Sequence, residues 1–159
     1  MPTDIANLQI SLDGEIAVVR NFVDLLRREQ GCLVRGESDS IASFVEPKSR
    51  CALELTRFAE QRAELLRGSG YTPDRAGMTR LLRERAGANT PAVVSWQALL
   101  KLAQTAKVLN ETNGTLINAR LQITQRALAT LFSAARLPGA YAADGSTVSM
   151  RTAQQLAIA

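Results

Sequence analysis

Residues 90–136 read TPAVVSWQALLKLAQTAKVLNETNGTLINARLQITQRALATLFSAAR, and this stretch decides the fold. Its apolar residues recur at the three- and four-residue spacing of an amphipathic helix. A helix of about 45 residues would be about 68 Å long, which exceeds what one compact domain of this size needs to close its core. The stretch therefore predicts one long helix that packs against partners.

Short motifs mark both ends of this predicted helix. Thr90 followed by Pro91 is typical of a cap and a first helical position, because proline lacks an amide hydrogen and its fixed φ suits the first turn. Leu137 and the proline and glycine after it end the pattern. Trp96, near the start of the helix, is interpreted as a core anchor rather than as a binding hot spot.

The N-terminal half predicts two further helices that pair as an α-hairpin. In residues 5–35, apolar side chains alternate at steps of three and four, with charges on the other face. Gly36 supplies a stop for this helix. Ser38 or Asp39 is then expected to cap a second helix, which continues through Leu66.

Proline and glycine predict where the rest of this half is interrupted. Pro47 removes an amide donor and crowds the preceding turn, so we expect a kink or a restart near Glu46. The Gly-Ser-Gly sequence of residues 68–70 ends the second helix. Thr72 followed by proline then predicts a capped short helix over residues 73–85.

Composition favours an all-α protein without catalytic machinery. The aromatic fraction of the 159 residues is only 4%, and glycine and proline do not recur every eight to twelve residues as they do in all-β chains. The chain has no histidine, which removes the commonest general base near neutral pH and most zinc and haem ligation. We therefore expect no enzyme activity, no cofactor and no metal site.

Cysteine content and the N-terminal sequence predict a cytoplasmic location. Cys32 and Cys51 are too few for a secreted disulfide framework, and the hairpin would separate them by about 12 Å, so we expect two free thiols. The first 23 residues have no basic segment before Arg20 and contain acidic residues, unlike a signal peptide. No run approaches the length of a membrane span, so membrane insertion is not expected either.

A polar cluster of Asn110, Asn113 and Gly114 interrupts the long helix. The two asparagines are three residues apart and project from nearly the same face. One interpretation is a pair of surface amides, and the other is that one or both point into the bundle and fix its register. Gly114 is unfavourable inside a helix, so it predicts the close approach of another helix or a flexible point.

These residues bring the sequence close to a known family. The stretch NETNGTLINAR at residues 110–120, then Leu128, Leu131 and YAADG at residues 141–145, resembles the flagellar export chaperone FlgN family. Lys48 agrees with this resemblance, as does Arg62 ahead of a Leu-Leu pair. Two positions depart from the family pattern: Ala142 replaces a common glycine, and Pro47 lies in a segment that is usually unbroken helix.

The resemblance implies a cytoplasmic chaperone that is not an enzyme. Its partners would be the hook-associated proteins of the hook-filament junction, whose C-terminal helices it holds and delivers to the flagellar export gate. The export ATPase is a further candidate partner. Tyr141 matches a tail tyrosine that takes part in gate docking in related chaperones; its alternative is a tail aromatic that folds back on the helix end.

The helical pattern supports this class independently. If the hairpin packs flush with the start of the long helix, the last fifteen residues of that helix extend about 20 Å beyond it. Such a surface would be completed by a partner helix laid onto it. The apolar residues expected to bind cargo there are Leu121, Ile123, Leu128, Leu131, Phe132 and Leu137.

Charge leaves a second interpretation open. Residues 1–85 hold 13 basic and 13 acidic side chains, whereas residues 86–159 hold 6 basic and 2 acidic side chains, which accounts for the net charge of +4. A basic C-terminal helix is also compatible with a coiled-coil assembly or a nucleic-acid-associated adaptor. Nucleic acid is not favoured as a partner, because only one aromatic residue accompanies the arginines of that helix.

The sequence as a whole predicts an all-α fold. We expect an elongated antiparallel helical bundle in residues 1–137, with the N-terminal α-hairpin packed on one long C-terminal helix. A flexible tail is expected to follow in residues 138–159, where a short amphipathic segment could become helical on binding.

Overall fold

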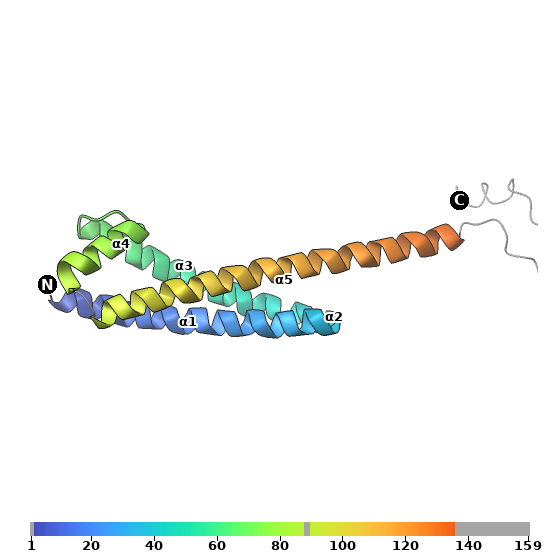
Figure 1. Ribbon diagram of the computed structural model, residues 1–159, viewed down its shortest axis with the longest axis horizontal. Helices are drawn as coiled ribbons and strands as arrows, with labels where there is room; N and C mark the ends of the chain where they lie inside the picture. The colour runs from blue at the N-terminus through green and yellow to red at the C-terminus, as the bar shows by residue number, and fades with distance from the viewer. Residues whose placement is uncertain (1, 88–89, 136–159) are drawn as a thin grey trace, which may run out of the picture. The chain divides into compact units, whose positions relative to one another are not determined.

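The computed structural model describes residues 2–87 and 90–135, and all regular structure within these ranges is helical (Figure 1). The elements are α1 (Pro2–Arg35), α2 (Ser38–Ile41), the 3₁₀ helix η1 (Ala42–Phe44), α3 (Val45–Gly68), α4 (Arg75–Leu81), the π-helix η2 (Leu82–Ala86) and α5 (Pro91–Ala135). The predicted all-α class is confirmed, as is the N-terminal hairpin packed on one long C-terminal helix. None of the helices in the described ranges has the length and hydropathy that crossing a membrane requires.

Contacts divide the chain into two units, Met1–Leu116 and Ile117–Ala159. The first unit holds α1 to α4 and the N-terminal part of α5. The described part of the second unit is the remainder of α5, residues 117–135. The predicted tail, residues 138–159, lies outside the described residues, and the predicted boundary after residue 137 stays a prediction.

Polar pairs fix the directions of the three long helices of the first unit. Glu15 on α1 pairs with Arg62 on α3, and Glu29 on α1 pairs with Lys48 on α3, so these two helices are antiparallel. Gln9 on α1 donates to the Ser95 hydroxyl on α5 at 2.8 Å. Further along both helices, α1 and α5 are bonded again through Asn113, so they run parallel, and both begin at the same end of the unit (Figure 1).

Apolar side chains from every α-helix except the four-residue α2 form the main core. The α1 positions alternate at steps of three and four, as the sequence predicts, and Trp96 of α5 is 7% exposed, in agreement with a core anchor. The buried members of this cluster are Leu8, Leu12, Ile16, Val19, Val23, Leu26, Leu66, Met78, Leu81, Leu82, Ala92, Trp96, Leu99 and Ala106. A second cluster, at the other end of the hairpin, contains the two cysteines, both of them free and buried.

Pro47 explains why the second half of the hairpin is built in pieces. The chain turns at Gly36, whose φ of 86° favours glycine, and then forms α2 and η1 before α3 begins at Val45. This is the restart predicted near Glu46. Pro47 is the third residue of α3, in the first turn, where amide groups have no acceptor within the helix and none is lost.

Two predicted helix caps are wrong. The residue preceding α2 is Glu37, and neither it nor the predicted Ser38 or Asp39 supplies a side-chain cap. The cap of α4 is Asp74 rather than Thr72: its carboxylate accepts from the Gly77 amide at 2.7 Å, which lowers the pKa of this carboxyl group. An aspartate matches this role better because an anion is favoured at the positive end of a helix.

Gly77 is required where the chain enters α4. A Cβ atom built on it would lie 1.9 Å from the carbonyl oxygen of Thr72, a backbone atom that cannot move aside. By contrast, a Cβ atom on Gly68, at the end of α3, would meet nothing within 4 Å.

We therefore expect Gly77→Ala to lower the free energy of unfolding by about 2 kcal/mol or more, through steric strain in the cap. Gly68→Ala is the matched control and should leave stability unchanged or raise it by up to about 1 kcal/mol, because alanine is the better helix former. Urea denaturation followed by circular dichroism measures both. Equal effects of the two substitutions would contradict the packing described at Gly77.

Candidate functional site

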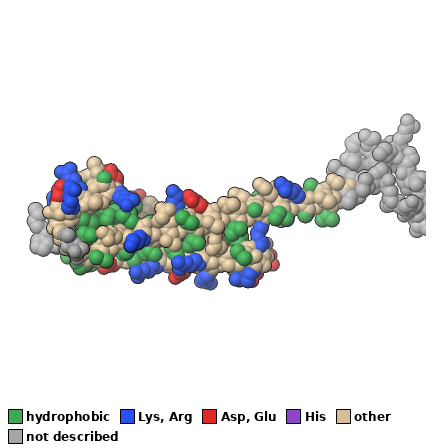
Figure 2. Space-filling view, in the orientation of Figure 1, with side chains coloured by type: hydrophobic (Ala, Val, Ile, Leu, Met, Phe, Trp, Pro, Cys, Tyr) green, Lys and Arg blue, Asp and Glu red, His purple; other side chains and the backbone are tan. Residues whose placement is uncertain are grey.

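The described part of the second unit has large apolar side chains in contact with solvent. Leu121, Leu128, Leu131 and Phe132 are 47–66% exposed, and Ile117 is 37% exposed. At 3.6 residues per turn these five side chains fall within about 100° of the helix circumference. They form the apolar stripe, and Figure 2 shows hydrophobic side chains along this part of α5.

Ile123 does not belong to this stripe. It is 66% exposed, but it follows Leu121 by two residues, which is a rotation of about 200° around the helix. Ile123 therefore faces away from the centre of the stripe, and its predicted part in cargo binding stays a prediction, separate from binding through the stripe. Leu137 and Tyr141 lie outside the described residues.

The stripe lies on a weakly charged helix. Arg120 and Arg126 are the only charged side chains in residues 117–135, so this segment is basic and contains no carboxylate. Exposed apolar faces of this kind mark interaction sites in folded proteins. The arrangement can bind an apolar partner helix, and its two arginines favour a partner with acidic flanks.

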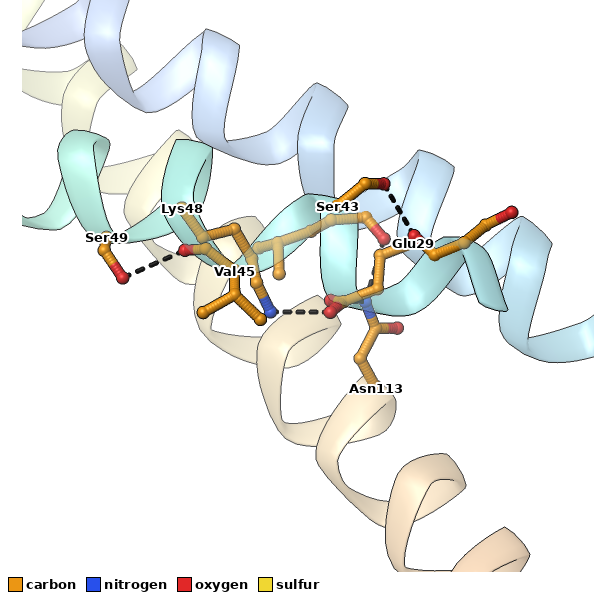
Figure 3. Close-up of polar contacts among 8 residues, drawn as sticks. Glu29, Ser43, Val45, Lys48, Ser49 and Asn113 are labelled. Atoms are coloured by element: carbon orange, nitrogen blue, oxygen red, sulfur yellow. Dashed lines mark hydrogen bonds and ion pairs between the residues drawn. The ribbon is translucent and has the colours of Figure 1, made fainter. Parts of the chain in front are cut away.

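In the first unit, three long helices meet at one buried polar group. The side-chain amide of Asn113 on α5 donates to the Leu26 carbonyl oxygen at 2.8 Å and to the Glu29 carboxylate at 2.9 Å, both on α1. The ammonium group of Lys48 on α3 donates to the other oxygen of Glu29 at 2.6 Å (Figure 3). We call Glu29, Lys48 and Asn113 the polar node.

Burial makes the polar node specific. Glu29 and Asn113 are each only 1% exposed, and a buried carboxylate is costly unless it is paired and hydrogen-bonded. Lys48 supplies the opposite charge from α3 and Asn113 supplies an amide from α5. A shift of either helix along α1 would break one of these bonds, so the node fixes the register of all three helices.

The predicted polar cluster is therefore split by the structure. Asn113 is buried and points into the bundle, as one of the two interpretations states, whereas Asn110 is an exposed surface amide. A Cβ atom on Gly114 would meet no atom within 4 Å, so the close approach of another helix predicted there is not found among the described residues. Asn113 and Gly114 thus have different roles despite being adjacent.

Glu29 was not expected as a partner of Asn113, although the sequence pattern contained a signal. Glu29 stands between Leu26 and Leu33 at the step of three and four that defines the core face of α1. An acidic residue in that phase requires a basic partner on a neighbouring helix. Lys48 is that partner, and Arg62 has the same role for the buried Glu15.

Replacing Asn113 by alanine is expected to lower the free energy of unfolding by about 1–3 kcal/mol, because the Glu29 carboxylate and the Leu26 carbonyl lose a donor while buried. Chemical denaturation of the purified chain measures this change.

Asn110→Ala is a matched control, three residues earlier on the same helix. Because Asn110 is exposed, its replacement should change stability by less than about 0.5 kcal/mol or raise it slightly. Equal stability of the two variants would contradict the contribution of Asn113 to the polar node.

Comparison with known proteins identifies the family. The family model described as FlgN protein matches residues 1–149, which include the polar node, the apolar stripe and Tyr141. No curated protein and no solved structure matches the chain significantly. Since the family model covers most of the 159 residues, the chain belongs to the FlgN family.

Proposed function

We propose that this chain is a flagellar export chaperone that binds the C-terminal helices of hook-associated proteins and delivers them to the export gate. Membership of the FlgN family supports the export chaperone role. The family is one of chaperones rather than enzymes, and the protein would act in the cytoplasm, before secretion. Its cargo would be the proteins of the hook-filament junction.

The apolar stripe is the single observation that carries the cargo-binding proposal. Four large side chains about half or more exposed on one helical face leave apolar surface that a partner helix would remove from water. The geometry is that of an amphipathic helix laid against an apolar surface, with anchors at helical spacing. A cargo helix bound there would present a complementary apolar face.

Docking at the export gate is proposed for Tyr141, and Leu137 is proposed as a further cargo contact. Both proposals rest on the family pattern and the sequence, since both residues lie outside the described residues. The export ATPase is proposed as a further partner at the same stage of delivery.

The second candidate function is a coiled-coil assembly or a nucleic-acid-associated adaptor. The observation that favours it is the charge of residues 117–135, where Arg120 and Arg126 have no acidic neighbour. Binding to a polyanion would be dominated by these charges and would weaken steeply as salt increases.

Aspartate substitution of the apolar stripe distinguishes the two. Leu128→Asp, Leu131→Asp and Phe132→Asp are each expected to weaken binding of a C-terminal hook-associated protein peptide by about tenfold or more, because each places a charge in an apolar contact. Fluorescence anisotropy with the labelled peptide measures the affinity, which should change little between 50 and 300 mM salt, on the order of twofold.

Ile123→Asp is the matched control, since it adds the same charge to the same helix about 160° around the helix from Leu121. It should leave the affinity nearly unchanged. Equal losses for Ile123→Asp and Leu128→Asp would refute binding through the stripe, and an affinity for nucleic acid that falls steeply with salt would support the adaptor instead.

A further inference from the structure

The first unit contains a second surface with binding character, separate from the apolar stripe. A hollow of about 350 Å³ lies between the α4–η2 segment and α5, and another of about 430 Å³ is lined by α1, α3 and α5. Both hollows are lined by Trp96 and Leu100, so they lie next to each other along α5, and we call the two together the trough. Figure 2 shows hydrophobic side chains bordered by Lys and Arg side chains near α4 and the start of α5.

The trough has the length of a helix. Its lining residues on α5 run from Val93 to Asn110, which is about 26 Å or nearly five helical turns. Small side chains, Ala59 on α3 and Ala103 on α5, line its wall and permit a backbone to approach closely. Each hollow has the volume of a typical ligand pocket, large enough to accept one or two apolar side chains.

The border of the trough is basic. Arg75 and Arg83 line the hollow beside α4, and Lys107 lines the other one. The only carboxylate in either lining is Glu15, which is 7% exposed and already paired with Arg62. Arg83 and Lys107 each lie 3.9 Å from one exposed carboxylate of the same helical segment, Glu84 and Glu111, and their own side chains are 76% and 67% exposed. An occupant therefore gains from acidic groups beside its apolar face.

The π-helix is a further feature of this surface. η2 supplies Leu82 to the wall and Arg83 to the border. π-helical turns are rare in proteins, and those that occur are often found at functional sites. The trough is thus formed by an irregular element on one side and a regular helix on the other.

We propose that this trough binds an acidic amphipathic helix of another protein. Charge disfavours the segments of this chain as occupants: residues 117–135 carry two arginines and no acidic residue, and residues 136–159 carry two arginines and one aspartate. The same two segments of a second copy would carry the same charge. The site does not depend on the apolar stripe, so the protein holds two partners at separate surfaces.

Trp96 gives a direct test, because it is the only tryptophan in the chain and lines both hollows. The probe is a synthetic 18-residue amphipathic helix with leucines on one face and glutamates on the other, titrated into the full chain. A saturable change in Trp96 emission is expected. The same peptide with glutamine in place of glutamate should bind at least about tenfold more weakly.

Variants locate the binding. Arg75→Glu combined with Arg83→Glu is expected to weaken binding about tenfold or more, and Ala103→Phe should do the same by filling the wall. Arg57→Glu, an exposed charge reversal on α3 outside both linings, is the control and should have no effect. Circular dichroism verifies that each variant is folded.

Four results would overturn the proposal. They are no saturable response of Trp96, equal affinity for the glutamine peptide, full affinity in the Arg75→Glu, Arg83→Glu variant, and a loss of affinity in Leu128→Asp, which would place the peptide on the apolar stripe. A change in Trp96 emission on raising the protein concentration would instead identify a second copy as the occupant. A change on removing residues 136–159 would identify the chain's own C-terminal segment.

Discussion

The buried carboxylate of Glu29 is the constraint on which the arrangement of the helices depends. An apolar core alone fixes which faces of α1, α3 and α5 meet, but leucines at steps of three and four tolerate a shift of one helix along another. A carboxylate that is only 1% exposed does not tolerate such a shift, because it must accept hydrogen bonds from Lys48 on α3 and from Asn113 on α5. Apolar burial therefore supplies most of the stability, and the polar node supplies the register.

The node also separates two uses of α5. Its N-terminal part carries Trp96, Leu99 and Ala106 into the core of the first unit, ahead of Asn113. Beyond Leu116 the large apolar residues of the same helix are exposed, and all of them in the described range except Ile123 form the stripe. One helix thus contributes to a stable bundle and, in our proposal, offers its other part to cargo, so partner binding need not disturb the core.

Much of this fold could be predicted because helical periodicity is a local property. The end of α1 before the stop at Gly36, the restart before Pro47, the end of α3 and the start of α5 all follow from a few neighbouring residues. The caps were less predictable, because Thr72 and Asp74 are both residue types that cap helices. Only the three-dimensional structure shows that the Asp74 carboxylate accepts from the Gly77 amide, while the Thr72 carbonyl oxygen lies against Gly77. Asn110 and Asn113 could not be distinguished for a similar reason, because three residues of separation leave both near the same face.

The candidate sites depend on longer-range information still. Periodicity identifies Leu121 and Leu128 as one face of a helix, but it cannot tell whether the same chain covers that face. The trough gave no signal in the sequence, because its walls come from five separate elements and its border from basic residues that resemble solvated charges.

The central claim is that the apolar stripe is the surface that receives cargo. Hydrogen exchange of the full chain, with and without a C-terminal hook-associated protein peptide, tests it most directly. The account predicts that the peptide slows exchange in residues 117–133 about tenfold or more and leaves α1 and α3 unchanged. Unchanged exchange in residues 117–133 under saturating peptide, with protection elsewhere in the chain, would contradict it.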